Sequence, residues 1–327
     1  MNPHLTRRRI LAAGTVAVMS GVVGLPRLTL GITADETVNL EKHPYIDAHS
    51  HVWSPDTKRW PLANNKTKED LAPPSFTPEE LLKLAHEQQV GRVVLIQHHT
   101  YHGWDNSYLI DCAARYPGAF VVTGMIDDRA KASGGRQPPD TIPAQMDALL
   151  KQRVKAFRIT SWIYKDEWLA SEGMAAMWKH AAKSGQIMSC LIDAKDLVAV
   201  DAMCGKHPDT NVVIDHFARI GVDGTIRDED VKNLCGLARH KNVFPKLSAY
   251  YALGKKQAPY LDLVPMIRRV LDAYGPSRCM WASDAPYQAD KGHKYGDSIA
   301  LIRDRLDLSA GDKEQLLRKT AERVYFS

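Results

Sequence analysis

Cysteine is scarce in this chain of 327 residues, and its cysteines do not come in pairs. There are five, widely spaced and without a Cys-x-x-Cys motif: Cys112, Cys190, Cys204, Cys235 and Cys279. An odd, scattered set argues against a disulfide framework. We therefore expect most of these side chains to be small, buried hydrophobic groups.

The chain also lacks an excess of positive charge once its first residues are set aside. The whole sequence has 43 basic and 38 acidic side chains, a formal charge of +5. Residues 1–34 hold four arginines and no acidic residue, so the remaining residues carry 39 basic and 38 acidic groups, or +1. No basic stripe is left, which argues against a nucleic-acid partner.

Long hydrophobic runs are absent except near the start of the chain. Thr6-Arg7-Arg8-Arg9-Ile10 precedes a charge-free stretch, residues 11–26, and Ile32-Thr33-Ala34 offers a cleavage site. This order is typical of a secretory signal peptide, and the paired arginines resemble the twin-arginine export signal. An uncleaved membrane anchor is the alternative, but the stretch is shorter than the ~20 apolar residues that span a bilayer.

From this we predict a signal peptide over residues 1–34 and a linker over residues 35–44. The twin-arginine export machinery is then a partner, and the protein is periplasmic or otherwise exported. We expect no membrane contact after cleavage, and the sequence does not indicate an oligomeric state.

Residues 45–327 alternate strand and helix patterns. One strand leads into His49, and others are predicted at 92–97, 120–126, 155–159, 187–192, 211–214, 243–247 and 278–282. A helix starts at Pro78 with Thr77 as its N-cap, and further helices are predicted at 105–116, 141–152, 173–184, 195–206, 228–240, 260–274 and 310–324. Eight strand–helix units predict a single (β/α)8 TIM-type barrel. An open doubly wound sheet is the alternative, but no Gly-rich phosphate loop follows the first strand.

Four side chains that can bind a metal fall at the carboxyl ends of these strands, where barrels place their chemistry. His49 and His51 lie two apart on the first strand and so share a face; His216 follows the sixth strand and Asp284 the eighth. Three imidazoles and a carboxylate suit one zinc ion, and Asp284 could also take a proton from water. The alternative is a pair of solvated histidines, a buried His216 and a helix-capping Asp284.

Charged and aromatic residues near the same rim could contact a substrate. Arg158 ends the fourth strand and Arg219 follows His216; either could bind a carboxylate or form a structural salt bridge. Lys246 on the seventh strand could stabilise an oxyanion or pair with a carboxylate inside the barrel. Trp53 is a fourth candidate substrate contact. Of His98 and His99, an extended chain would turn only one inward, and residues 129–139 could form a lid.

Several motifs in order carry a family resemblance. Asp47-x-His49-x-His51-x-Trp53, Ile214-Asp215-His216, Lys246-Leu247-Ser248 and Ser283-Asp284-x-Pro286 resemble the amidohydrolase superfamily, in particular amidohydrolase-related family 2. The nearest likeness is to its lactonase-type branch of sugar-lactone hydrolases and 2-pyrone-4,6-dicarboxylate hydrolase. The resemblance implies a distorted barrel that hydrolyses a ring ester, with His49, His51 and His216 binding metal or the carbonyl oxygen and Asp284 as general base.

One departure from the superfamily pattern is the fifth strand, which has no histidine in residues 187–192. Some lactonase-type relatives share this feature and work without tightly held metal, so a metal-independent enzyme stays open beside one with a single divalent ion.

We therefore expect an exported hydrolase that opens the lactone ring of a small, acidic or sugar-derived substrate, with Asp284 and His216 catalytic. One alternative is a metal-dependent decarboxylase of a small unsaturated acid. The other is a barrel that has lost catalysis and binds a ligand.

Overall fold

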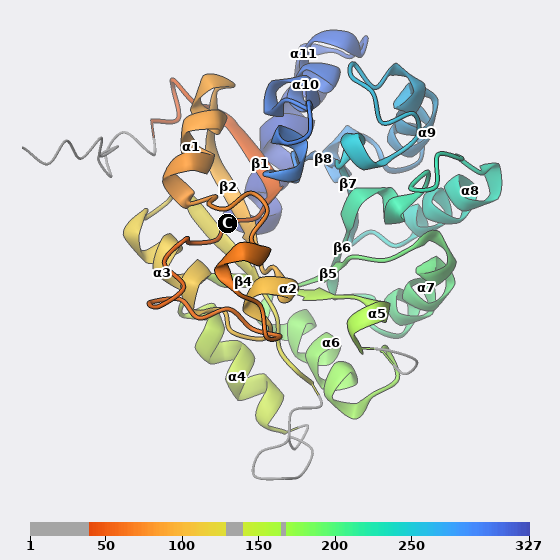
Figure 1. Cartoon of the computed structure of the whole chain (residues 1–327). Coiled ribbons are helices and arrows are strands. Elements are labelled where there is room, and N and C mark those ends of the chain that lie inside the picture. Colours follow the sequence, from red (N-terminus) through yellow and green to blue (C-terminus); the bar gives the residue numbers. More distant parts are fainter. Residues whose placement is uncertain (1–38, 129–139, 165–167) are drawn as a thin grey trace, which may run out of the picture. The chain divides into compact units, whose positions relative to one another are not determined.

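The predicted barrel is present. The computed structural model describes residues 39–128, 140–164 and 168–327, and in them eight parallel strands each pair with the next along the chain (Figure 1). They are β1 (Tyr45–Ser50), β2 (Val90–Ile96), β3 (Phe120–Gly124), β4 (Val154–Ile159), β5 (Ile187–Cys190), β6 (Asn211–Ile214), β7 (Val243–Leu247) and β8 (Met280–Trp281). This architecture confirms the α/β barrel and rules out the open doubly wound sheet.

The ring closes between the first strand and the residues that follow the last one. The His51 amide donates to the Ala285 carbonyl at 2.8 Å, and the Asp284 amide donates to the His49 carbonyl at 2.8 Å. β8 is shorter than predicted: a 3-10 turn over Pro276–Arg278 precedes it, and after it the chain bends away at Asp284, whose φ is +66°. Closure therefore brings His49, His51 and Asp284 together on one seam.

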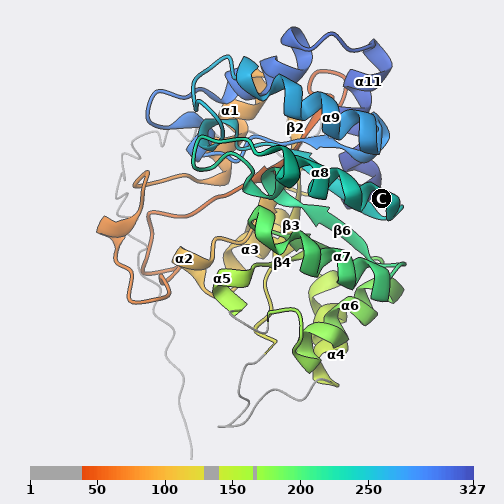
Figure 2. The ribbon, with the colours of Figure 1, turned by 90° about the vertical axis from the view of Figure 1, so that its right-hand side faces the viewer.

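The helices lie outside the ring of strands (Figures 1 and 2). The longer ones are α1 (Pro78–Glu87), α3 (Ser107–Arg115), α4 (Thr141–Leu150), α6 (Glu172–Ser184), α7 (Leu197–Lys206), α8 (Asp228–Gly236) and α9 (Val264–Tyr274). α1 starts where the sequence predicts, since Thr77 and Glu80 form a capping box. Each of the others overlaps its predicted range.

Three short helices escaped the sequence patterns: α2 (His99–His102), α5 (Ser161–Tyr164) and α10 (Tyr295–Ala300). The last predicted helix is interrupted, because α11 (Ala310–Glu314) passes into wider π-helical turns over Gln315–Lys319 and Glu322–Phe326.

The C-terminal turns pack into the barrel from the amino ends of the strands. Ala321 and Tyr325 belong to the same buried cluster as inward side chains such as Ile46, Val94 and Ala282. Arg92 of β2 pairs with Glu322 at 2.7 Å, which holds these turns in place. The amino end of the barrel is thereby filled, and the open end is the one where the strands finish.

Some predictions have a simple outcome here and others fall outside the described residues. All five cysteines are free, and all but Cys235 are buried. In the part of the chain that the structure describes, no helix has the length and apolar character needed to cross a bilayer. The signal peptide of residues 1–34 and the lid of residues 129–139 both lie outside it, as do residues 35–38 of the linker.

Candidate active site

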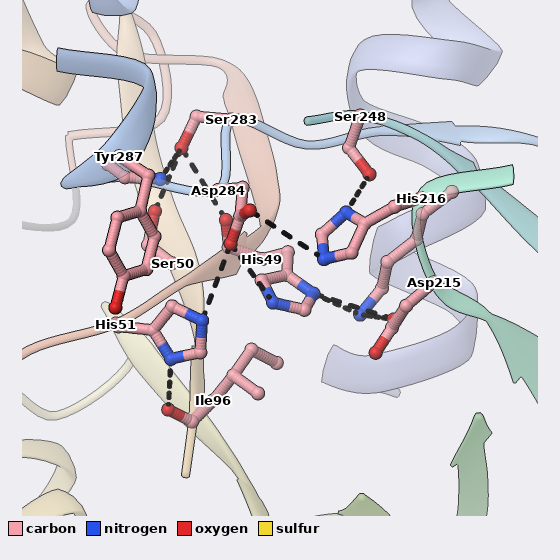
Figure 3. Close-up of polar contacts among 12 residues, drawn as sticks. His49, Ser50, His51, Ile96, Asp215, His216, Ser248, Ser283, Asp284 and Tyr287 are labelled. Carbon is pink, nitrogen blue, oxygen red and sulfur yellow. Dashed lines mark hydrogen bonds and ion pairs between the residues drawn. The ribbon is translucent and has the colours of Figure 1, made fainter. Parts of the chain in front are cut away.

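Three imidazole rings converge on one carboxylate at the open end of the barrel (Figure 3). The Nε2 atoms of His49 and His51 lie 3.4 and 3.3 Å from Asp284 Oδ1, and His216 Nε2 lies 3.8 Å from Asp284 Oδ2. All four residues are at least 95% buried. His49 lies on β1 and His51 directly follows its last residue, and residues two apart on an extended chain share a face.

The other nitrogen of each ring already has a partner. His51 Nδ1 lies 2.9 Å from the Ile96 carbonyl, so it must carry the hydrogen. His216 Nδ1 lies 2.8 Å from Ser248 Oγ, and His49 Nδ1 lies 3.4 Å from Asp215 Oδ1. A carbonyl or carboxylate partner at Nδ1 fixes the tautomer in which Nε2 keeps its lone pair. The Nε2 lone pair of His51 therefore points at Asp284, whereas His49 Nδ1 also lies 3.3 Å from the Lys246 ammonium, a donor, so Asp215 alone does not fix the tautomer of His49.

Burial keeps these histidines neutral. It lowers the pKa of His51 to about 3, and it lowers the pKa of His49 well below the ordinary value. Burial also lowers the pKa of His216, although Asp284 and Asp215 oppose that shift. For Asp284, burial raises the pKa despite His216 and a hydrogen bond from Tyr251.

The backbone is strained at the same place. Asp284 has φ +66°, and the four residues from His216 to Arg219 have φ values of +52° to +54°. L-residues reach this left-handed region at a cost of about 1–2 kcal/mol each. Such outliers persist where the surrounding structure over-determines them, and they cluster at functional sites.

The arrangement fits a divalent metal ion. Ligand atoms of His49, His216 and Asp284 all lie within 4.8 Å of one another, and His51 Nε2 adjoins the same carboxylate. His49 Nε2 and Asp284 Oδ1 are both buried and have no hydrogen-bond partner. Lone pairs on buried, neutral rings that face a carboxylate need a cation or a proton between them. Imidazole nitrogens and one carboxylate oxygen are common ligands of zinc.

A second carboxylate lies beneath the first and is fully satisfied. Asp215 Oδ1 is 3.0 Å from Lys246 Nζ, and Ser189 donates to the Asp215 carboxylate at 3.3 Å. Both Asp215 and Lys246 are completely buried. Burial alone would raise the pKa of Asp215, but Lys246 and His49 hold it well below the usual range. Asp215 thus supports His49 as a permanent anion.

A cavity of about 240 Å³ opens above the histidines. His51, His216 and Asp284 form its floor, and polar and aromatic side chains from the loops after several strands form its walls. Those used below are His98, His99, Arg158, Thr160, Trp162, Arg219, Tyr251 and Tyr287. The cavity suits a molecule of about one ring, with its reacting atom at Asp284.

Comparison with known proteins agrees with this geometry. A family model described as Amidohydrolase (Amidohydro_2) matches residues 46–326. The chain belongs to the amidohydrolase family. Its L-fucono-1,5-lactonase relative from Burkholderia ambifaria is 27% identical over 79% of this chain and 85% of that protein. The 2-pyrone-4,6-dicarboxylate hydrolase of Comamonas testosteroni is also 27% identical, over 78% of this chain and 81% of that protein.

A solved structure of another amidohydrolase has the same fold. The enzyme from Burkholderia multivorans, crystallised with bound zinc, superposes with a TM-score of 0.69 at 22% identity. The match covers 86% of this chain and 99% of that one. The lactonase-type relatives and this fold make a lactone-hydrolysing amidohydrolase plausible.

The residues predicted to contact substrate fall into two groups. Arg158 and Arg219 line the cavity. Lys246 and Trp53 are fully buried and outside the lining: Lys246 pairs with Asp215, and the Trp53 indole donates to the Pro73 carbonyl at 2.8 Å. Trp53 packs against the ring of His98, so it supports the wall from behind.

The expectation for the two histidines after β2 was wrong in one respect. His98 and His99 both line the cavity, because the chain turns into α2 at His99 instead of continuing extended. His98 Nε2 lies 2.6 Å from the Tyr287 hydroxyl, which fixes that ring against the wall.

Sequence reasoning missed three contributors. Tyr251 donates to Asp284 Oδ2 at 2.7 Å, and Tyr287 stacks beside it. Asp47 ties β1 to β8, since it accepts from the amides of His49 and Ser283 at 3.1 and 2.8 Å. A signal existed for each, because Tyr251 and Tyr287 follow strands seven and eight and Asp47 belongs to the first motif.

Proposed function

We propose that this amidohydrolase hydrolyses the lactone ring of a small substrate. The observation that carries the proposal is the convergence of three neutral imidazoles on Asp284 at the floor of a cavity for one ring. The lactone-hydrolysing relatives support the choice of an ester bond in a ring.

The chain's own residues account for the proton transfers. Asp284 Oδ1, which has no hydrogen-bond partner, accepts a proton from a water molecule as its oxygen bonds to the lactone carbonyl carbon. Asp284 then returns that proton to the ring oxygen when the carbon–oxygen bond breaks, which yields a hydroxy acid. Tyr251 holds Oδ2 throughout and so keeps Oδ1 turned towards the histidines. The raised pKa of Asp284 matches a group that must both take and return a proton.

We include one zinc ion in the proposal, held by His49, His51, His216 and Asp284. Bound there, it would supply a Lewis acid that stabilises negative charge on oxygen. The nitrogen-rich ligand set and the zinc found in the Burkholderia multivorans enzyme support this choice.

Export through the twin-arginine route is also part of the proposal. It rests on the order of basic, apolar and small residues in positions 1–34. A fusion of these residues to a reporter that requires folded export would test it.

The first experiment combines elemental analysis with a lactone panel, using protein as purified and its His49→Ala variant. We expect about one zinc per chain, turnover of at least one lactone, and loss of both in the variant. Turnover without metal would refute the zinc assignment. Release of CO₂ from an unsaturated acid, without lactone hydrolysis, would establish the decarboxylase, and zinc without any turnover would indicate a binding barrel.

A further inference from the structure

Arg158 is a buried cation without an ion-pair partner among the described residues; burial lowers its pKa, and Asp215 and Asp284, which lie beyond ion-pair distance, oppose that shift. It is the penultimate residue of β4, lines the cavity and is 7% exposed. Its Nη1 donates to the Gln97 carbonyl at 3.3 Å, and its Nε has no partner. Across residues 39–128, 140–164 and 168–327, no carboxylate lies within the 4.0 Å of an ion pair to it. Burying a charge without an ion-pair partner costs several kcal/mol, and a bound anion would offset this cost.

Thr160 presents a second unsatisfied donor on the same side. It directly follows the last residue of β4, two positions beyond Arg158, and both side chains line the cavity. Its side chain is completely buried and lines the cavity, yet its hydroxyl has no hydrogen-bond partner. A buried hydroxyl without a partner is uncommon and implies a missing acceptor. Two neighbouring donors without acceptors therefore face the same space.

Arg219 differs from Arg158 in having an ion-pair partner. It also lines the cavity, but its Nη1 lies 2.8 Å from Asp193 Oδ1, and its guanidinium lies 5.1 Å from the centre of the Trp162 ring. About one third of its side chain is exposed. Its charge is thus already balanced, so it offers an incoming anion less than Arg158 does.

From these observations we infer that Arg158 and Thr160 bind a carboxylate of the substrate. The substrate is then a lactone that carries one carboxylate, placed against the end of β4 while the ring ester lies over Asp284. A guanidinium suits this task because its parallel N–H groups match the two oxygens of a carboxylate. This inference rests on the proposed function for its reaction but not for its binding site.

Binding of an unreactive probe tests the site without requiring turnover. Furan-2-carboxylate and furan-2-methanol share a ring and differ in the anionic group, and calorimetry can compare them on wild-type, Arg158→Gln and Thr160→Val proteins. We expect wild type to prefer the carboxylate, Arg158→Gln to bind it about 10- to 100-fold more weakly, and Thr160→Val about 5- to 10-fold more weakly. Arg227, which pairs with Asp223 on the surface, supplies the control Arg227→Gln.

Kinetics then test the substrate class. For a neutral lactone and the same ring bearing one carboxylate, the ratio of kcat/KM values should favour the acid in wild type and fall about 10- to 100-fold in Arg158→Gln. A ratio that falls in Arg219→Gln instead would overturn the inference, as would equal binding of the two furans. Carboxylate binding at Arg158 without hydrolysis of any lactone would refute the proposed function and leave the binding site standing.

Discussion

Asp215 and Asp284 are two buried carboxylates in adjacent layers of one barrel, and both touch His49. Asp215 has a lysine, a serine and a histidine around it, so its charge is fixed. Asp284 has one oxygen held by Tyr251 and the other without a partner, facing histidine lone pairs. Burial would raise the pKa of both carboxylates, but Lys246 and His49 hold the pKa of Asp215 well below its usual range, whereas the pKa of Asp284 stays raised. The lower layer, in which the carboxylate of Asp215 has its partners, supports the barrel. In the upper layer Asp284 Oδ1 has no hydrogen-bond partner and is available for proton transfer.

The largest effect should follow from removing the charge of the upper carboxylate. Asp284→Asn keeps the volume but abolishes proton acceptance, so kcat for lactone hydrolysis should fall about 10²- to 10⁴-fold. In metal-free protein its free energy of unfolding in urea should change by less than about 1 kcal/mol, since the ion-pair partners of Asp284 among the described residues are neutral histidines. Normal turnover by this variant would exclude Asp284 as the base.

In the lower layer the same kind of change should damage stability. Lys246→Met leaves Asp215 as a buried, uncompensated anion, which should cost about 3–5 kcal/mol of unfolding free energy. The double variant Lys246→Met/Asp215→Asn removes both charges and should recover part of that loss. Equal losses in the single and double variants would show that the pair contributes packing and not charge balance.

Lowering the pH should reduce the free energy of unfolding of metal-free protein through His51, which belongs to the upper layer. The pKa of folded His51 is about 3 and its unfolded value is 6.5, so the unfolded chain binds the extra proton below pH 6.5. This residue alone should lower the free energy of unfolding by about 1.4 kcal/mol for each pH unit between about 6 and 3. Urea titrations at several pH values should show this slope, and His51→Gln should reduce it by about that amount.

The smallest effect concerns the tyrosine that orients Asp284. Tyr251→Phe removes one hydrogen bond to Oδ2 and should lower kcat about 5- to 15-fold, because Oδ1 is less well aimed. Tyr250→Phe is the matched control, since the Tyr250 hydroxyl donates to the Leu247 carbonyl away from the cavity. A similar loss in both variants would point to a general disturbance of the loop after β7.

Strand periodicity and the barrel rule were sufficient to predict which strand ends carry His49, His51, His216 and Asp284. They are local signals, because a residue's place on its own strand determines the face it occupies. These signals could not predict which charged side chains form ion pairs. Nothing in the sequence distinguishes Arg158 from Arg219, and only the folded chain shows that Asp193 neutralises one of them. Tyr251 was missed for the same reason, since its role depends on how the loop after β7 crosses Asp284.

The sequence also failed to predict the shortest helices and the end of β8. α2 and α5 have four residues each, too few for helical periodicity to be visible. The end of β8 depends on a left-handed residue, Asp284, and on hydrogen bonds to a strand more than 230 positions earlier. Such positions are fixed by ring closure and not by local preference.

Closure of the ring at its first and last strands also has a consequence for how the protein is made. β1 must wait for Ala285, and the inner cluster waits for Tyr325, so the barrel cannot finish while the last quarter of the chain is still on the ribosome. Until then β1 is an open strand edge, able to pair with another nascent chain. Synthesis therefore passes through a long interval in which a holding chaperone can protect this edge.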